Sequence, residues 1–289
     1  MTDPWARPAD QPRPGPPPPQ FPQGQGAPPP PPPPPGNDSS LLAKVKNLFR
    51  DPLSIVLVVV IVVALSLAGL IGGELYARSR ADSVVAKVTS CVVEDQVSAS
   101  FDVVPPFLIQ HMTGHYTNIN IETAGNQIRN AKGMKVVLDI RDVRLEDTAT
   151  SSGSIGSLVA NISWSADGIK QTIQDGIPLV GSFINSVKTN PSEGTIELVG
   201  ALGSIVAKPT VVNNGIQLQV SELTGLGFTL PRETVQPALD LFTDQLTKNY
   251  PMGIKADSVS VTDSGVASQF STQNAEIPKG EQDPCFTGL

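Results

Sequence analysis

The stretch between residues 53 and 71 constrains this chain most, because it holds nineteen consecutive residues without a charge. It reads LSIVLVVVIVVALSLAGLI. At ~1.5 Å per helical residue, such a run is long enough to cross the hydrocarbon core of one bilayer. The polar segment before it is too long for a cleavable signal peptide, and the following GGELYARSR lacks an Ala-x-Ala-like cleavage site. We therefore predict one retained transmembrane signal anchor over residues 53–73.

The segment before the anchor is dominated by proline. Residues 1–36 hold 17 of the 28 prolines and four charges that cancel. Such a composition cannot bury enough surface to offset the entropy of ordering, so we predict a disordered tail over residues 1–40. One interpretation of this tail is a solvated linker, and the other is a docking site for a cytoplasmic partner. Residues 41–52 are predicted to form a short amphipathic helix against the membrane.

Two cysteines bear on the orientation, which the basic residues leave open. Lys and Arg are equally numerous on the two sides of the anchor, so the positive-inside rule does not choose. Cys91 and Cys285 bracket the C-terminal region. They are either two unrelated thiols or one disulfide, and a disulfide persists outside the cytoplasm. We expect the disulfide, and with it a single-pass protein of the cell membrane. Its N-terminus is then cytoplasmic, and residues 74–289 form a periplasmic or extracellular domain.

This C-terminal domain is acidic and large enough for one sizeable core. Residues 74–289 carry 15 Lys and Arg against 23 Asp and Glu, a net charge of −8. The charge argues against nucleic acid as a partner and against electrostatic adhesion to an anionic membrane.

Hydrophobic periodicity predicts an α+β domain in which a meander of antiparallel strands lies between two helices. The first helix continues from the anchor over residues 74–90. The strand candidate 134–145 changes the parity of its apolar residues near Arg141 and Asp142. We interpret this change as a β-bulge that turns both apolar sets inward, including Leu145.

Capping and turn signals define the second half of the domain. Ser165 is expected to cap a helix over residues 166–175. Asn213 and Asn214 mark a tight hairpin. Pro231 opens the most clearly amphipathic helix, which has one apolar stripe at Val235, Leu239, Phe242 and Leu246.

Several motifs of this domain together resemble a known family. They are FDVVPPFLIQHMTGHYTNINI after the first helix, LDIRDVRLED at the end of a strand, and LPRETVQPAL before the last helix. The pattern is similar to the LmeA-like family of actinobacterial envelope proteins, over about residues 74–280. Its turn motif is matched by Pro106, Phe107, Leu108, Met112 and Gly114.

The resemblance implies a phospholipid-binding protein with a fold similar to tubular lipid-binding domains. In such a fold a curved antiparallel sheet wraps a long amphipathic helix and leaves an apolar groove. This chain differs from the pattern in its uncleaved anchor and its proline-rich tail.

Two sets of residues are candidates for lipid contact. Apolar stretches interrupted by proline or glycine suggest groove walls, although ordinary core is the alternative for each residue. These groove candidates are Phe107, Leu108, Ile109, Met112, Ile177, Leu179, Phe183 and Phe242. The basic residues cluster in one part of the acidic domain and suggest contacts with a phosphate head group, although solvated strand edges are the alternative. These head-group candidates are Arg129, Lys132, Lys135, Arg141 and Arg144.

Metal binding and catalysis find little support in the sequence. His111 and His115 have helical spacing, but Gly114 lies between them and no third ligand or HExxH motif accompanies them. No GxSxG motif or phosphate-binding glycine loop is present.

We therefore expect a protein without catalytic activity, metal or cofactor. Its partners are expected to be the membrane and a phospholipid of anionic type, and its role to be assistance in the assembly or transport of envelope lipids or lipoglycans. An envelope adaptor that recruits partners through its tail is the alternative, followed by a hydrolase.

Overall fold

The computed structural model describes residues 52–176, 181–229, 231–247, 251–279 and 284–286. The chain divides into two compact units, residues 1–61 and 62–289. All contacts discussed below lie within the second unit. The predicted disordered tail and juxtamembrane helix lie outside the described residues, apart from Pro52.

The first described element is α2, a helix of 42 residues over Pro52–Val93. It contains the apolar run and continues without a break through the predicted helix 74–90. No proline lies between residues 53 and 93 to end the helix. By length and composition, α2 is the one helix among the described residues that is able to cross a membrane.

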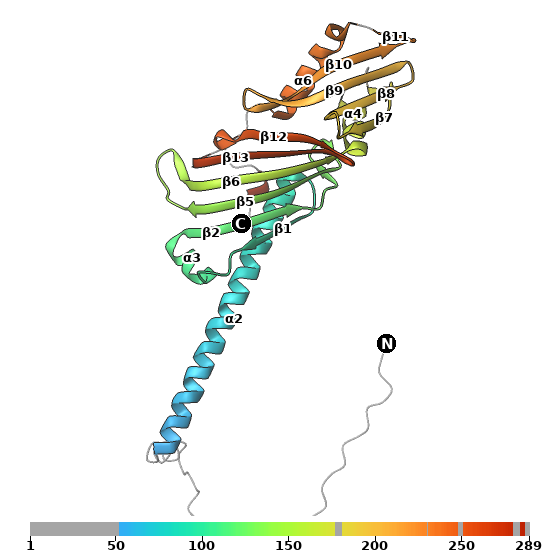
Figure 1. The fold of residues 1–289 in the computed structure, drawn as a ribbon. Coiled ribbons are helices and arrows are strands. Elements are labelled where there is room, and N and C mark those ends of the chain that lie inside the picture. Colours follow the sequence, from blue (N-terminus) through green and yellow to red (C-terminus); the bar gives the residue numbers. More distant parts are fainter. Residues whose placement is uncertain (1–51, 177–180, 230, 248–250, 280–283, 287–289) are drawn as a thin grey trace, which may run out of the picture. The chain divides into compact units, whose positions relative to one another are not determined.

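A six-stranded antiparallel sheet follows α2 (Figure 1). Its strand order is β1-β2-β5-β6-β13-β12. The strands span Val97–Phe101 (β1), His115–Thr123 (β2), Met134–Arg144 (β5), Ser151–Ser165 (β6), Gly265–Pro278 (β13) and Lys255–Thr262 (β12). Two short elements lie between β1 and β5: the helix α3, Phe107–Thr113, and the ribbon of β3, Gln127–Ile128, with β4, Ala131–Lys132.

A five-stranded antiparallel sheet forms much of the rest of the domain. The predicted α+β class with antiparallel strands is confirmed, but the strands form two large sheets and not one. Its strand order is β11-β10-β9-β8-β7. The strands span Phe228–Thr229 (β11), Gly215–Gly225 (β10), Gly203–Val212 (β9), Thr195–Gly200 (β8) and Ile184–Asn190 (β7). Two helices contact this sheet, α4 over Ala166–Gly176 and α6 over Gln236–Thr247. Three 3-10 turns complete the chain, at Arg232–Thr234, Pro251–Gly253 and Pro284–Phe286.

The five-stranded sheet and its helices enclose a tightly buried core. The side chains of Ile173 from α4 and Leu198 from β8 are each 1% exposed. Leu239 from α6 is buried in the same cluster, as its position in the predicted apolar stripe requires. Ser165 caps α4 as predicted, since its Oγ accepts a hydrogen bond of 3.1 Å from the Gly168 amide.

The predicted hairpin at Asn213 and Asn214 is confirmed. Both residues have positive φ, 50° and 66°, as a two-residue turn between twisted strands requires. Its strands, β9 and β10, pair antiparallel on either side of it.

The parity change on β5 has a different cause from the one predicted. Asp142 has a φ of 54°, and the pairing of β5 with β2 and β6 shows no register shift there. The strand pairing skips Asp142 and the residues opposite it on the neighbouring strands. Together they form one row across the sheet, which consists of Thr117, Asp142, Gly156 and Asn274. Because β2, β5, β6 and β13 all change parity at this row, the register between them is preserved there.

With this row, most of the apolar residues of β5 that were predicted to point inward do so. Leu138, Ile140 and Val143 belong to one core cluster, although they differ in parity. Leu145, by contrast, is 52% exposed, so its predicted inward position was wrong.

Gly156 makes the row possible, which gives a test of the fold. A Cβ at this position would lie 2.7 Å from Asp142 Cβ. We expect Gly156→Ala to lower the free energy of unfolding by about 1–3 kcal/mol through overpacking. Thermal unfolding of the full chain in detergent measures this, with Ser157→Ala as the control that changes little. Equal stability of Gly156→Ala and the wild type would contradict this account of the row.

Candidate lipid-binding surface

The face of the six-stranded sheet that contacts α2 is apolar but incompletely covered. Its buried centre includes Leu158 and Phe270. Around this centre lie large apolar side chains that remain half-buried. Those on the sheet are Phe101, Ile119, Leu138, Ile140, Ile162 and Ile277, and Ile216, Met252 and Ile254 come from β10 and the segment before β12. Among the described residues, the cluster at the five-stranded sheet has a similarly buried centre but fewer half-buried hydrophobic neighbours, namely Trp164, Val187, Val235 and Val266.

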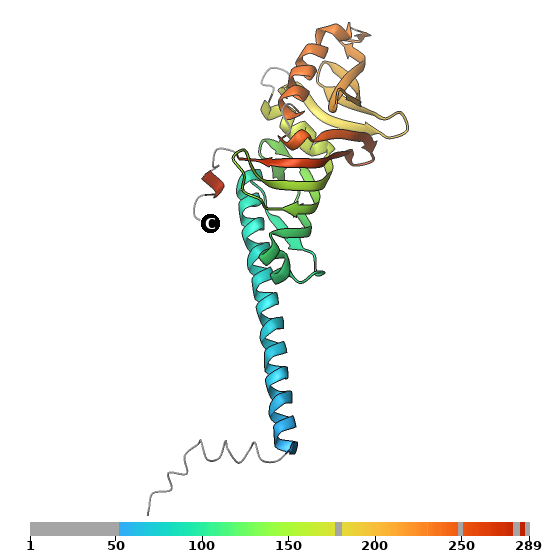
Figure 2. The ribbon, with the colours of Figure 1, turned by 90° about the vertical axis from the view of Figure 1, so that its left-hand side faces the viewer.

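α2 covers this face with small side chains. Ala77 and Ala81 are the helix residues that pack against the cluster, and α2 has no buried residue of its own. Figure 2 shows α2 running along one face of the sheet. Because the large apolar side chains around the cluster are only half-buried, part of this apolar surface stays accessible to another apolar molecule.

Polar and covalent links hold α2 in this place. Near the start of the domain, Glu74 accepts hydrogen bonds from the amides of Phe107 (2.5 Å) and Leu108 (3.0 Å). Asp82 accepts a hydrogen bond of 3.1 Å from the Phe101 amide. These carboxylates therefore fasten α2 to β1 and to the N-terminus of α3.

The pKa values of the two carboxyl groups shift in opposite directions. The hydrogen bond from the Leu108 amide, with those from Phe107 and Arg78, lowers the pKa of Glu74 although burial opposes it. Burial raises the pKa of Asp82, against the opposing effects of Phe101 and Arg78. Glu74 is thus the link that stays charged to a lower pH.

The end of α2 is fixed by two further links. Cys91 forms a disulfide with Cys285, 194 residues later in the sequence, as predicted. Arg129 donates from its amide and its Nε to the carbonyls of Val93 (2.7 Å) and Val92 (3.0 Å). These two bonds satisfy carbonyls that a helix end otherwise leaves without a partner.

α3 is organised by Gln110, which the sequence did not single out. Its side chain is fully buried and makes several hydrogen bonds. Nε2 donates to the carbonyls of Asp102 (3.1 Å) and Pro105 (2.6 Å), while Oε1 accepts from the Thr117 amide (3.1 Å). A polar residue therefore lies buried at the centre of the predicted turn motif. Its burial is tolerated because these hydrogen bonds offset the cost of removing the amide from water.

The predicted groove residues fall into different environments. Phe107 is 4% exposed in the core and lies against the rings of Phe101 and Tyr116. Leu108 is half-buried, whereas Ile109 and Met112 are exposed on the outer side of α3.

The remaining groove residues lie elsewhere or outside the description. Phe183 is exposed near the five-stranded sheet, where its carbonyl accepts a hydrogen bond from Ala201. Ile177 and Leu179 lie outside the described residues, as does the side chain of Phe242.

The predicted head-group residues have partners within the chain. Lys135 pairs with Glu122 (2.5 Å), Arg141 with Asp139 (3.5 Å) and Arg144 with Asp142 (3.2 Å). Lys132 Nζ donates to Gln127 (2.6 Å), and Arg129 binds the end of α2 as described above.

Comparison with known proteins shows the family of this chain. Residues 68–271 match the model of the family described as LmeA-like phospholipid-binding. The chain belongs to this family. The match runs from within α2, six residues before Glu74, to the middle of β13, so it includes strands of both sheets and most of the candidate surface.

This LmeA-like chain also has close mycobacterial relatives. Uncharacterized proteins of Mycobacterium tuberculosis and Mycobacterium bovis are 56% identical to it over 241 residues. The alignment covers 83% of this chain and 69% of each relative. No solved structure matches the chain.

The two histidines of this LmeA-like protein bind side chains of the domain. His111 Nδ1 lies 2.9 Å from the Tyr116 hydroxyl, and His115 Nε2 lies 2.5 Å from Asp142 Oδ1. The hydrogen bond with His115, together with Arg144, lowers the pKa of Asp142. In the described part of the chain, no group of three or more His, Cys, Asp or Glu side chains is placed to hold a metal.

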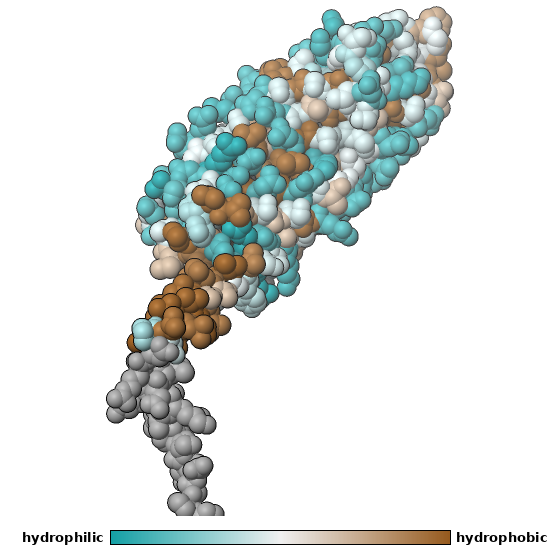
Figure 3. Space-filling model, turned by 60° about the horizontal axis from the view of Figure 1, so that its bottom comes forward, coloured by the Kyte–Doolittle hydropathy of each residue, from teal (hydrophilic) through white to brown (hydrophobic). Residues whose placement is uncertain are grey.

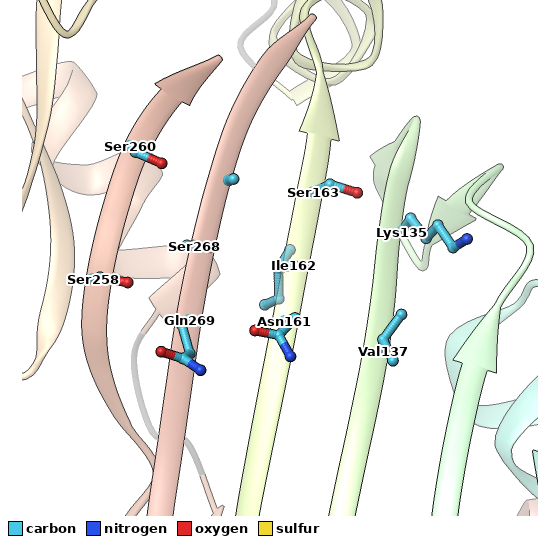
Figure 4. Close-up of a pocket in the computed structure, with 10 residues that line it drawn as sticks. Lys135, Val137, Asn161, Ile162, Ser163, Ser258, Ser260, Ser268 and Gln269 are labelled. Carbon is cyan, nitrogen blue, oxygen red and sulfur yellow. The ribbon is translucent and has the colours of Figure 1, made fainter.

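Two surface hollows of the LmeA-like domain are lined mainly by polar residues. The first, of about 490 Å³, lies on the strands β5, β6, β13 and β12 (Figure 4). Its polar lining residues are Lys135, Asn161, Ser163, Ser258, Ser260, Ser268 and Gln269. The second, of about 400 Å³, is lined by residues that include Lys208, Arg232 and Glu233. Acyl chains find a better match on the apolar face next to α2 than in either hollow.

The link between Glu74 and α3 gives a prediction for amide exchange. Glu74→Ala should speed hydrogen exchange at the amides of Phe107 and Leu108, because both lose their acceptor. Acidification should lower the protection of the same two amides in the wild type, measured relative to the intrinsic exchange rate at each pH. With its pKa lowered from 4.5, Glu74 contributes stability above that value, and this contribution is lost as the pH falls through the folded pKa. Hydrogen-exchange mass spectrometry of the full chain measures both effects.

A matched control is available in Asp95. Its carboxylate accepts hydrogen bonds from the amides of Gly125 (2.9 Å) and Asn126 (3.0 Å). Asp95→Ala should speed exchange at those two amides and leave Phe107 and Leu108 as in the wild type. Unchanged exchange at Phe107 and Leu108 in Glu74→Ala would show that the carboxylate does not hold α3.

Proposed function

We propose that this protein is a membrane-anchored envelope protein that holds the acyl chains of a phospholipid on the α2-facing side of its six-stranded sheet. The half-buried apolar side chains of that face carry the proposal. A lipid chain laid over Leu138, Ile140 and Ile162 removes apolar surface from water, at roughly 25 cal/mol per Å². The membership of a phospholipid-binding family supports the same ligand.

The proposed topology is a single pass with the N-terminus in the cytoplasm. Residues 53–73 serve as the anchor, residues 1–40 and 41–52 form the cytoplasmic tail and a juxtamembrane helix, and residues 74–289 form the outer domain. The Cys91–Cys285 disulfide supports an oxidising location for that domain. An anchored protein with a lipid-binding domain presents or transfers lipid near one membrane during envelope assembly.

The proposed ligand is an anionic phospholipid, and the proposed role requires no catalysis. The head-group candidates Arg129, Lys132, Lys135, Arg141 and Arg144 remain a prediction. Each has a partner within the chain, so a lipid phosphate would have to replace that partner. Arg141 is the most favourable of the paired ones, because its 3.5 Å contact with Asp139 is long and its side chain is exposed. Replacement there loses little energy, since exposed ion pairs contribute about 0–1 kcal/mol.

Photo-crosslinking tests where the acyl chains lie. The full chain is reconstituted with a phospholipid that carries a photoreactive group in its acyl chain, and labelled peptides are mapped by mass spectrometry. We expect labels in β5 and β6 in addition to the anchor. Leu138→Trp should reduce the labels in β5 and β6 several-fold, because the larger side chain occupies the surface that the lipid covers.

The neighbouring residue on the same strand provides the matched control. Val137 lines the polar hollow, while Leu138 belongs to the apolar cluster near α2. Val137→Trp should therefore leave the labels in β5 and β6 unchanged. Labels confined to the anchor in the wild type, or equal losses in the two variants, would reject the proposed location.

A further inference from the structure

A second apolar surface lies on and around α3. Five large apolar side chains here are between 51% and 86% exposed, and we call them the interfacial patch: Val103, Val104, Ile109, Met112 and Leu145. We propose that the interfacial patch inserts into the head-group layer of the same bilayer that α2 crosses. The inference rests on the anchoring part of the proposed function and adds a second contact between the domain and the membrane.

The two sides of α3 differ in their contacts, and this difference creates the patch. Phe107 and Gln110 point into the domain and are buried. Ile109 and Met112, three residues apart, share the opposite side. A short helix in a water-soluble domain normally has polar residues on its outer side, so apolar residues on both sides indicate a second apolar environment.

The patch is rigid, which favours insertion as a preformed surface. Gln110 ties α3 to the preceding loop through the carbonyls of Asp102 and Pro105. The Leu145 amide donates to the carbonyl of Gly114 at the end of α3 (2.9 Å). Leu145 is thereby brought next to the helix from the far end of β5.

The link to Glu74 places the patch at the depth of the lipid head groups. Residues 53–73 span roughly 30 Å as a helix, which matches one hydrocarbon core, so Glu74 falls at its boundary. Glu74 binds the first two amides of α3 directly. Tyr76, two residues further and 75% exposed, is typical of the aromatic residues found at this boundary.

The surface view agrees with this placement. Figure 3 shows hydrophobic residues on the face of the domain from which α2 emerges. The bilayer is the occupant that these observations favour, because the patch is connected to the apolar run through a single hydrogen-bonded residue. A second copy of the chain or another protein would need no such position beside the anchor.

Depth-dependent fluorescence quenching tests the inference. The full chain with Met112→Trp is reconstituted into phosphatidylcholine–phosphatidylglycerol vesicles with nitroxide labels near the head group or deep in the acyl chain. We expect a blue-shifted emission, and quenching by the shallow label about two-fold or more above the wild-type background from Trp5 and Trp164. Leu226→Trp is the matched control, since Leu226 is also highly exposed, at 76%, but lies in the turn between β10 and β11. It should show no added quenching.

A second substitution tests the same surface without relying on one variant. Ile109→Asp added to Met112→Trp should reduce the quenching toward the level of Leu226→Trp, while the Cys91–Cys285 disulfide still forms. Equal quenching of the indoles introduced at positions 112 and 226, in a chain that floats with the vesicles, would overturn the inference. A cross-linked dimer through α3 with no quenching would overturn it too. A chain that does not float with vesicles would overturn both the anchoring and this inference, whereas the photo-crosslinking of β5 and β6 tests lipid binding separately.

Discussion

The attachment of α2 to the six-stranded sheet is the constraint on which the candidate site depends. Ala77 and Ala81 are the α2 residues that pack against the core cluster of the sheet, and no residue of the helix is fully buried. Its position is instead set by carboxylates that accept backbone hydrogen bonds, by Arg129 at its end and by a disulfide. A helix that is attached by hydrogen bonds and a disulfide does not need to bury the whole apolar surface beside it. The sheet therefore keeps an apolar face that a lipid chain can cover without displacing a packed core.

The two sheets differ in how many half-buried apolar side chains surround their buried cores. The five-stranded sheet has α4 and α6 against it and a core with almost inaccessible side chains, which is the arrangement of a structural core. The six-stranded sheet has its row of parity change through Asp142, which brings apolar residues from both halves of β5 to the α2 side. The row thereby enlarges the apolar face, while polar residues such as Lys135 and Ser163 line the hollow in Figure 4.

Local signals in the sequence predicted the elements that depend on few residues. The uncharged run predicted α2, Ser165 predicted the start of α4, and the Asn213–Asn214 pair predicted a hairpin; each rests on neighbours in the sequence. The bracketing cysteines also predicted their disulfide, although nothing local fixes that pairing. The division into two sheets was missed, because strand pairing depends on contacts between distant segments. The parity change of β5 was visible in the sequence, but its cause was not, since the register depends on what the neighbouring strands do at Gly156 and Asn274.

The candidate site residues stay a prediction, and the structure shows only where their side chains lie. The motif around Phe107 predicted a turn where α3 forms, but a buried ring and a lipid-facing ring have the same sequence signature. Gln110 was overlooked because a glutamine in a short helix suggests an exposed residue, and only the folded chain supplies its several partners. The half-buried residues on β2, β5 and β6 have the apolar alternation of ordinary core strands, and only the folded chain shows that they stay partly exposed.

A structure of the full chain determined in nanodiscs of native lipid tests the central claim most directly. The account predicts elongated acyl-chain density between α2 and the six-stranded sheet, in contact with Leu138, Ile140 and Ile162. It would be contradicted by a sheet face closed by α2, with these three side chains fully buried and no lipid density beside them.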